Sequence, residues 1–156
     1  MIQSFGRQIS TIYQNITIHL DVQLKPYQIG TAQVSFLVAI LQHDGINQET
    51  LTANSHVDKS TTTRSIAKLE KAGYITRKKD PNDNRAYKIY ITKKGRNIEP
   101  KLYNILKQLN EILSEGLTQT EKSEFEQLLE KTEQNILSQN KKNKGVTARL
   151  DLAGRS

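Results

Sequence analysis

Basic and hydroxyl-bearing side chains gather in one stretch of this chain, from Asp58 to Arg96. The stretch contains 12 Lys and Arg against 4 Asp and Glu, a net charge of +8, while the whole chain of 156 residues has a net charge of +7. Ammonium and guanidinium groups bind phosphates, and an arginine can also form two hydrogen bonds with the edge of a guanine. The basic stretch is therefore suited to binding a polyanion. The alternative interpretation is an ordinary lysine-rich surface in contact with water.

Two predicted helices with a tight turn between them lie at the start of this stretch. Asn47 and Asp58 belong to the residue types that cap helices, so one helix is expected from Asn47 to about Asn54 and the next from Asp58 to about Ala72. Gly73 can adopt the left-handed conformation that ends a helix. Two such helices form a helix-turn-helix, in which the second helix enters the major groove of DNA.

The second of these helices separates an apolar face from a face suited to DNA. Three residues share the inward face: Thr62, Ile66 and Leu69. The other surface carries small, hydroxyl-bearing or cationic residues: Ser60, Thr61, Thr63, Arg64, Ala67 and Lys68. We expect Arg64 to form a bidentate contact with guanine and the hydroxyls to bind phosphates. Solvated surface charge is the alternative for Arg64 and Lys68.

A β-hairpin is expected to follow. The ranges Tyr74–Lys79 and Ala86–Ile91 are rich in strand-forming residues, and residues 80–85 between them are dense in turn formers. Five polar residues of this hairpin form a predicted DNA-binding wing: Lys78, Lys79, Asp83, Arg85 and Lys88. We expect Asp83 to hold the Arg85 guanidinium extended toward a narrow A·T-rich minor groove, while the lysines contact phosphates. An exposed ion pair between Asp83 and Arg85 is the alternative.

Apolar residues at three- and four-residue spacings predict helices on both sides of this stretch. An amphipathic helix is expected from Ile2 to about Leu24, and an apolar helix capped by Thr31 from Ala32 to about Gln42. A long helix should run from Lys93 to about Glu115, with an apolar stripe at Ile98, Leu102, Ile105, Leu106, Leu109, Ile112 and Leu113. A last helix, begun by a capping-box pattern at Thr118, carries Phe125, Leu128, Leu129, Ile136 and Leu137.

These elements predict a mostly α fold with a small β-hairpin wing. A winged helix-turn-helix lobe is expected over residues 31–96, and a helical dimerisation lobe from residues 1–24 and 97–139. An apolar content of only 35% and a mean hydropathy of −0.63 favour long amphipathic helices whose apolar faces are covered by a second copy. Residues 140–156 are polar and basic without periodicity, so a disordered tail is expected there.

Several classes of function are disfavoured by the composition. The chain has no cysteine, and its histidines, His19, His43 and His56, fall in different predicted elements. We therefore expect no metal site, no cofactor and no thiol chemistry. No catalytic constellation or glycine-rich phosphate loop is recognisable, so no enzyme is expected. No apolar run is long enough to cross a membrane and no signal-peptide pattern is found, which predicts a cytoplasmic protein with no membrane partner.

Four linked motifs resemble those of the MarR family of bacterial transcription regulators. They are Asp-Lys-Ser-Thr-Thr-Thr-Arg at 58–64, Leu-Glu-Lys-Ala-Gly-Tyr-Ile-Thr-Arg at 69–77, Asp-Pro-Asn-Asp-Asn-Arg at 80–85 and Ile-Thr-Lys-Lys-Gly at 91–95. The resemblance extends over about residues 5–137 and is tightest over 51–96. It implies a homodimer that binds a pseudo-palindromic DNA operator, with a cavity between dimer helices and winged lobe where a small aromatic or lipophilic effector weakens DNA binding.

Four residues are candidates for lining such an effector pocket: Tyr13, His19, Tyr27 and Phe36. Ordinary packing is the alternative for each of them. The sequence thus predicts a sequence-specific DNA-binding transcription regulator that acts as a repressor. The competing interpretations are a helical module that binds a protein partner through its acidic helices, and an architectural protein that binds DNA without sequence preference.

Overall fold

The computed structural model describes residues 4–55 and 57–153, and describes side chains for all of these except 84 and 144–153. The chain divides into two compact units, Met1–Asn110 and Glu111–Ser156. The first two helices and the whole winged region therefore belong to one unit. This division differs from the expected one, in which residues 1–24 and 97–139 formed a lobe apart from residues 31–96.

The first unit begins with helix α1 (Phe5–Leu24), the short 3-10 helix η1 (Lys25–Tyr27) and helix α2 (Thr31–Gln42). The start of α2 differs from the prediction, because Thr31 is its first residue rather than its cap. Both the backbone N–H and the hydroxyl of Thr31 donate to Oδ1 of Asp21, at 2.9 and 2.7 Å. The Asp21 carboxylate on α1 thus caps the start of α2, a role that a side chain next to the helix usually has.

Helices α3 (Gln48–Asn54) and α4 (Lys59–Lys71) form the predicted helix-turn-helix. Asn47 caps α3 by accepting a hydrogen bond from the Glu49 N–H at 2.7 Å, as predicted. Gly73 follows α4 with a φ of +79°, the left-handed conformation expected of it.

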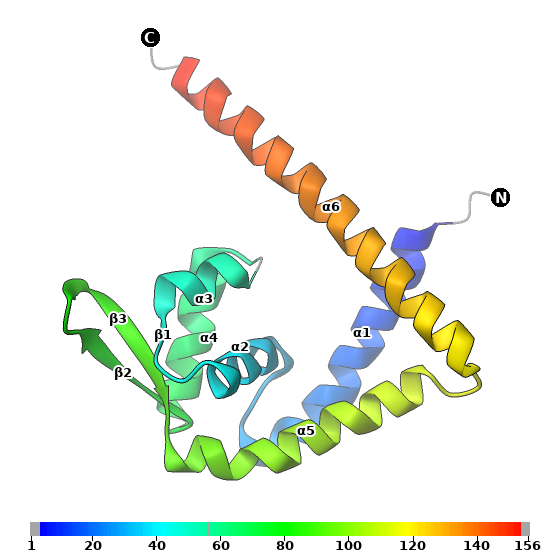
Figure 1. Ribbon diagram of the computed structural model, residues 1–156, viewed down its shortest axis with the longest axis horizontal. Coiled ribbons are helices and arrows are strands. Elements are labelled where there is room, and N and C mark those ends of the chain that lie inside the picture. The colour runs from blue at the N-terminus through cyan, green and yellow to red at the C-terminus, as the bar shows by residue number, and fades with distance from the viewer. Residues whose placement is uncertain (1–3, 56, 154–156) are drawn as a thin grey trace. The chain divides into compact units, whose positions relative to one another are not determined.

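A three-stranded antiparallel sheet completes the winged region, in the order β1 (Ile46–Asn47), β3 (Asp83–Ile91), β2 (Ile75–Asp80). The first strand was not predicted, because two residues carry no periodic signal. Strand β3 begins earlier than predicted, since Asp83 pairs with Asp80 across a tight turn. Figure 1 shows the β2–β3 hairpin reaching out from the neighbouring helices.

Helix α5 (Lys93–Leu113) starts in close contact with the hairpin. The Thr92 hydroxyl accepts from the Gly95 N–H at 3.1 Å and donates to the Gly73 carbonyl at 2.7 Å, so it caps α5 while joining it to the end of α4. A Cβ at Gly95 would overlap the carbonyl oxygen of Tyr74 and the side chain of Ile91. The glycine in the Ile-Thr-Lys-Lys-Gly motif is therefore required by the close approach of two backbones.

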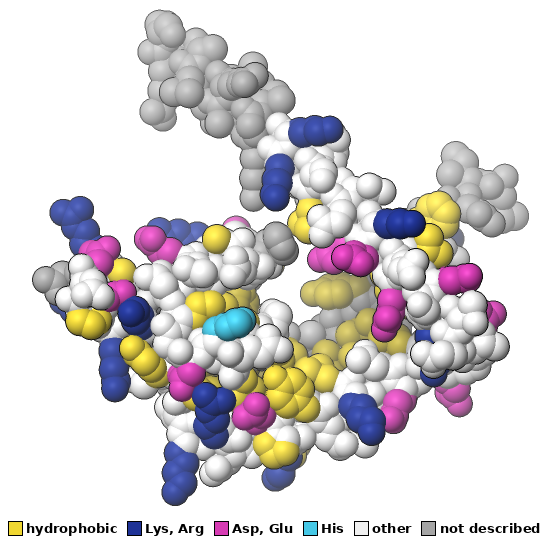
Figure 2. All heavy atoms as spheres, in the orientation of Figure 1, with side chains coloured by type: hydrophobic (Ala, Val, Ile, Leu, Met, Phe, Trp, Pro, Cys, Tyr) yellow, Lys and Arg dark blue, Asp and Glu magenta, His cyan; other side chains and the backbone are white. Residues whose placement is uncertain are grey.

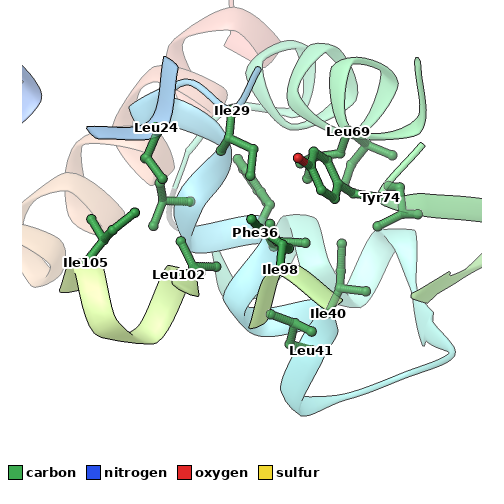
Figure 3. Close-up of a cluster of buried hydrophobic side chains, with 14 of the residues drawn as sticks. Leu24, Ile29, Phe36, Ile40, Leu41, Leu69, Tyr74, Ile98, Leu102 and Ile105 are labelled. Atoms are coloured by element: carbon green, nitrogen blue, oxygen red, sulfur yellow. The ribbon is translucent and has the colours of Figure 1, made fainter. Parts of the chain in front are cut away.

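One hydrophobic core joins α1, α2, α4, the sheet and α5 (Figure 3). Ile98 and Leu102 of α5 point into it, near Phe36 and Leu24 respectively. Four residues of the α5 apolar stripe are buried within this chain: Ile98, Leu102, Ile105 and Leu109. Only the end of the stripe is open, with Ile112 exposed by 54%. The expectation that the whole stripe serves a dimer contact is therefore wrong for its buried part.

The second unit consists mainly of helix α6 (Gln119–Ala153). Its start is the predicted capping box: Glu121 accepts from the Thr118 N–H at 2.7 Å, and the Thr118 hydroxyl accepts from the Glu121 N–H at 3.3 Å. The helix continues beyond Gln139, where its end was predicted. Residues 140–153 contain no proline and several good helix formers, which explains why the backbone continues as a helix. The last three residues of the expected tail lie outside the described part.

Candidate nucleic-acid interface

Helix α4 begins at a carboxylate that organises its first turn. The Asp58 side chain accepts hydrogen bonds from the Ser60 hydroxyl at 2.6 Å, the Thr61 hydroxyl at 2.6 Å and the Thr61 N–H at 2.9 Å. These bonds, that of the Ser60 hydroxyl first, hold the pKa of the Asp58 carboxyl well below its usual range. The predicted N-cap is therefore present, and its charge is stabilised by two hydroxyl groups of the candidate DNA-binding face.

The two faces of α4 are separated as predicted. The inward face comprises Thr62, Ser65, Ile66 and Leu69, none of which is exposed by more than 2%. The outer face carries Ser60, Thr63, Arg64, Ala67 and Lys68, all exposed. Lys71, which was not predicted, is also exposed and continues the line of Ser60, Arg64 and Ala67 at helical spacing. The outer face thus extends to the last residue of the helix.

Arg64 is oriented by a neighbour one turn earlier. Its Nη2 atom donates to the Thr61 hydroxyl oxygen at 3.3 Å, and that hydroxyl in turn donates to Asp58. The guanidinium is therefore linked through one hydroxyl to the carboxylate that caps the helix. A guanidinium held in this way loses less side-chain freedom when it binds a further partner.

The hairpin tip is shaped by two aspartates that bind backbone groups. The Asp80 carboxylate accepts from the Asn82 N–H, and the Asp83 carboxylate accepts from the Arg85 N–H, each at 2.9 Å. Asp83 was expected to hold the Arg85 guanidinium. It positions the Arg85 backbone instead, and within the described part of the chain the Arg85 guanidinium has no ion-pair partner. The tip therefore presents Arg85 with its charge available.

Four cations of the basic stretch are engaged inside the protein. Arg77 pairs with Glu70 at 2.6 Å, and Arg96 bonds both Asp44 at 3.1 Å and the Leu41 carbonyl at 3.2 Å. The Lys94 ammonium donates to the Ala72 carbonyl at 2.6 Å, at the end of α4.

Lys88 is the fourth of these cations, and it lies 3.5 Å from the Asp80 carboxylate. Lys88 was expected to contact a phosphate, and that expectation took no account of this internal ion pair. Lys78, its neighbour across the β2–β3 ladder, places its ammonium 5.3 Å from the centre of the Tyr90 ring. Two of the three wing lysines, Lys78 and Lys88, are thus partly engaged within the hairpin.

The other cations of the basic stretch supply positive charge that is not neutralised inside the protein. In the part of the chain that the structure describes, six of them have a side chain with no hydrogen bond, ion pair or ring contact: Lys59, Lys68, Lys71, Lys79, Arg85 and Lys93. Five of the six lie on α4 and on the hairpin, and Lys93 is the first residue of α5. Figure 2 shows Lys and Arg side chains over the hairpin, with acidic side chains near them. Pairing inside the protein therefore selects α4 and the wing as the electropositive surface.

The four candidate effector residues lie in different environments. Phe36 is 3% exposed and belongs to the packed core, whereas Tyr13 is 64% exposed on α1. Tyr27 is half-buried, its carbonyl accepts from the Tyr74 hydroxyl at 2.7 Å, and Lys101 lies over its ring. His19 is also half-buried. The four side chains thus range from the buried Phe36 to the exposed Tyr13.

Two findings concern the other function classes considered above. Across the described residues, no three His, Asp or Glu side chains gather in an arrangement that could hold a metal ion; His56 lies outside those residues. The helices described here also include none with both the length and the apolar character of a membrane span.

Sequence reasoning missed the residues that hold the interface in place. Glu70 and Arg77 are seven positions apart on either side of the left-handed Gly73, a spacing at which a helix end can meet the following strand. That signal was available. Asp44 and Arg96 are separated by 52 positions and give no local pattern, so only the fold brings them together.

Known proteins resemble this chain in sequence and in fold. The MarR family model matches residues 30–87, which span α2, the helix-turn-helix and most of the wing. A MarR transcriptional regulator from Methanosarcina mazei Go1 has 36% identity and a TM-score of 0.79, over 85% of this chain and 96% of that one. The chain belongs to the MarR family.

Two further relatives of this MarR-family protein bear on its function. An uncharacterised HTH-type transcriptional regulator of Bacillus subtilis strain 168, YybA, is 30% identical over 83% of this chain and 87% of its own length. A variant of MarR from E. coli, solved in complex with operator DNA, is 29% identical with a TM-score of 0.74, covering 81% of this chain and 91% of that one.

Proposed function

We propose that this protein is a sequence-specific DNA-binding transcription regulator that acts as a repressor from the cytoplasm. The observation that carries the proposal is the outer face of α4. Arg64 and Lys68 are exposed there, while the acids beside them, Asp58 and Glu70, are engaged within the protein. The similarity to a MarR variant in complex with operator DNA supports the same conclusion.

In this proposal α4 enters the major groove and Arg64 binds a guanine. A guanidinium can donate two parallel hydrogen bonds to the O6 and N7 atoms of guanine, and such a pair distinguishes guanine from the other bases by about 1–3 kcal/mol. The link from Arg64 through Thr61 to Asp58 directs the side chain before DNA is bound. Lys68 and Lys71 then contact phosphates, which position the helix without reading sequence.

The wing binds beside α4, with Arg85 in the minor groove. Arg85 lies after the tight turn and has an exposed side chain, as the insertion of an arginine into a narrow groove requires. Lys79, on the hairpin, would contact the flanking phosphates. Lys78 and Lys88 contribute less, because each already has a partner within the hairpin.

A homodimer that binds a pseudo-palindromic operator is part of the proposal. Large apolar side chains are exposed on three helices: Phe5, Ile9, Ile12, Ile18 and Val22 on α1, Ile112 and Leu113 on α5, and Phe125, Leu128, Leu129 and Ile136 on α6. Such surfaces are typical of interfaces rather than of monomers. Two recognition helices of a dimer must lie about 34 Å apart to enter successive major grooves.

A small aromatic or lipophilic effector would release the operator by favouring a dimer geometry in which this spacing is lost. Its effect is limited to the difference between its affinities for the two geometries. Half-buried Tyr27 and His19 remain candidates for contacting it, together with exposed Tyr13. Phe36 would act only through the core.

The test is selection of duplexes by the purified protein from a random-sequence pool, followed by competition with unrelated DNA at fixed salt. A regulator enriches a palindromic sequence and binds it at least about 1,000-fold more tightly than unrelated DNA. An architectural protein would bind every duplex alike, with steep salt dependence. A protein-interaction module would not be retained on DNA at all, and either result would refute the proposal.

A further inference from the structure

Three hydroxyls of the proposed DNA-binding face already use their protons within the protein. Ser60 donates to Oδ1 of Asp58 at 2.6 Å, and Thr61 donates to Oδ2 of the same carboxylate at 2.6 Å. The Thr63 hydroxyl donates to the carbonyl oxygen of Lys59 at 2.8 Å. A hydroxyl has a single proton to donate and two lone pairs that can accept. In this arrangement each hydroxyl therefore retains only acceptor capacity.

The direction of these bonds follows from the partners. A carbonyl oxygen has no proton, and the depressed pKa of the Asp58 carboxyl leaves it ionised at neutral pH. Ser60, Thr61 and Thr63 must therefore be the donors in all three cases. For the Ser60 hydroxyl to donate elsewhere, it would have to leave a charge-assisted hydrogen bond, which is among the strongest kinds in proteins.

Phosphates and base edges differ in what they can offer such an acceptor. The phosphate oxygens of DNA carry lone pairs and no protons, so they cannot donate to a hydroxyl. In the major groove, adenine presents its N6 amino group and cytosine its N4 amino group as donors. The negative charge of Asp58, one hydrogen bond away from Ser60 and Thr61, further disfavours a phosphate at this point.

The three hydroxyls are not equally placed. Thr61 is half-buried, and its oxygen already accepts from Arg64 Nη2 at 3.3 Å. Ser60 is exposed and lies on the same line of α4 as Arg64, one turn before it. Thr63 is also exposed, but at helical spacing it lies off the line of Ser60, Arg64 and Ala67. Ser60 is therefore the hydroxyl whose free lone pair is best placed to meet a base.

We propose that Ser60 is a specificity-determining residue that accepts a hydrogen bond from an adenine or cytosine amino group, and that the hydroxyls of Ser60, Thr61 and Thr63 do not bind phosphates. This inference rests on the proposed function and replaces the expectation that these hydroxyls contact the DNA backbone. Arg64 then supplies donors to a guanine, Ser60 supplies an acceptor to an amino group, and the lysines bind phosphates.

The test uses the duplex selected from the random pool and analogues that lack one amino group. Adenine is replaced by purine, or cytosine by 2-pyrimidinone, at one symmetric pair of positions at a time. The full-length protein is compared with Ser60→Ala, Ser60→Thr, Thr63→Val and, as a control on another helix, Ser123→Ala on α6. Melting temperatures establish that each variant is folded.

At one pair of positions, loss of the amino group should weaken the parent roughly two- to tenfold for each contact. Ser60→Ala should weaken the unmodified duplex by the same factor and show no further loss with the analogue. Ser60→Thr should keep the dependence on the amino group. Thr63→Val should bind every duplex like the parent, because the proposal assigns its hydroxyl no phosphate contact to lose.

Two other outcomes are informative in different ways. If Ser60→Ala weakens all duplexes equally, or if every analogue affects Ser60→Ala as much as the parent, the assignment of Ser60 is wrong while the regulator remains. If no duplex is enriched from the pool, the proposed function fails and this inference fails with it.

Discussion

Arg77 on strand β2 is held against Glu70 on helix α4 by three contacts. Its Nη2 and Nε atoms lie 2.6 and 2.9 Å from Oε2 of Glu70, and its backbone N–H donates to Oε1 at 3.3 Å. Glu70 is the acidic residue within α4, and Arg77 stands two positions after the start of β2. The contact therefore fixes the start of β2 to the end of α4.

Glu70→Gln should lower operator affinity even though it makes the protein more positive. A purely electrostatic role predicts the opposite, since removal of a negative charge strengthens binding to DNA. A double-mutant cycle with Arg77→Met should give a coupling energy for folding of about 1 kcal/mol, as for a well-oriented ion pair at the surface. Titration of operator DNA and urea unfolding measure the two quantities. Glu126→Gln on α6 changes the charge equally and serves as the control; equal or higher affinity of Glu70→Gln would exclude a positioning role.

Gly95→Ala should destabilise the protein by about 1–3 kcal/mol, the usual range for overpacking a close contact. Its Cβ would overlap the Tyr74 carbonyl and Ile91, and the backbone of α5 would have to move away from the hairpin. Gly6→Ala is the matched control on α1, where the nearest atom to the new Cβ is the Ser4 hydroxyl at 4.0 Å. It should instead stabilise the helix by roughly 0.5–1 kcal/mol. Urea unfolding of both variants measures the two changes in stability. Equal changes in the two variants would contradict the proposed overlap at Gly95.

Asp58 should stabilise the fold in a pH-dependent way. Its folded pKa is depressed by the Ser60 and Thr61 hydrogen bonds, so its contribution is fully present above the unfolded pKa, about 3.9, and is lost as pH falls through the lower folded value. Asp58→Ala should therefore melt at a lower temperature than the parent at pH 7, and the difference should shrink below about pH 4. Asp58→Asn retains a capping oxygen without the charge, so it should melt between the two at pH 7. A difference in melting temperature between Asp58→Ala and the parent that stays the same from pH 7 to below about pH 4 would refute this role of the Asp58 charge.

Arg64→Ala and Arg85→Ala should weaken binding in different ways. Loss of the proposed guanine contact in Arg64→Ala should cost about 1–3 kcal/mol on the selected site and relax discrimination at one symmetric pair of positions. Arg85→Ala should lose most affinity on A·T-rich flanks and show a shallower salt dependence. Titrations against selected and scrambled duplexes at two salt concentrations separate these effects.

Lys78→Ala and Lys131→Ala complete that comparison. Lys78 already lies against the Tyr90 ring, so its loss should weaken all sequences slightly and about equally. Lys131 is exposed on α6, outside the proposed surface, and its removal should leave binding unchanged. If Arg64→Ala and Arg85→Ala both bind like the parent, the surface proposed here is not the DNA-binding surface.

The proposed dimer predicts a mass in solution of about twice 17.7 kDa by light scattering at micromolar concentration. Leu128 on α6 is 59% exposed, and Leu128→Lys should shift the mass toward that of a monomer by placing a charge in the apolar contact. Gln127→Lys, at the adjacent exposed position, should leave the mass unchanged. A parent protein that remains monomeric would refute the dimer.

The elements that depend on neighbouring residues could be predicted from the sequence. Asn47, Asp58 and Thr118 cap their helices as expected, and Gly73 ends α4. Each of these signals acts within one helical turn, between groups whose spacing the backbone already sets. The exposed cations of α4 were predictable for the same reason, since helical periodicity assigns each side chain to a face.

Which of the cations remain available was decided only by the tertiary structure. Arg96 meets Asp44 from 52 positions away, and Lys94 reaches the end of α4. The capping of α2 by Asp21 of α1 likewise depends on the packing of two helices. These pairings require segments distant in sequence to pack side by side, and no local pattern encodes the distance between them. The same packing buried most of the α5 stripe inside one chain, because whether an apolar face meets its own core or a second copy depends on where the other helices lie.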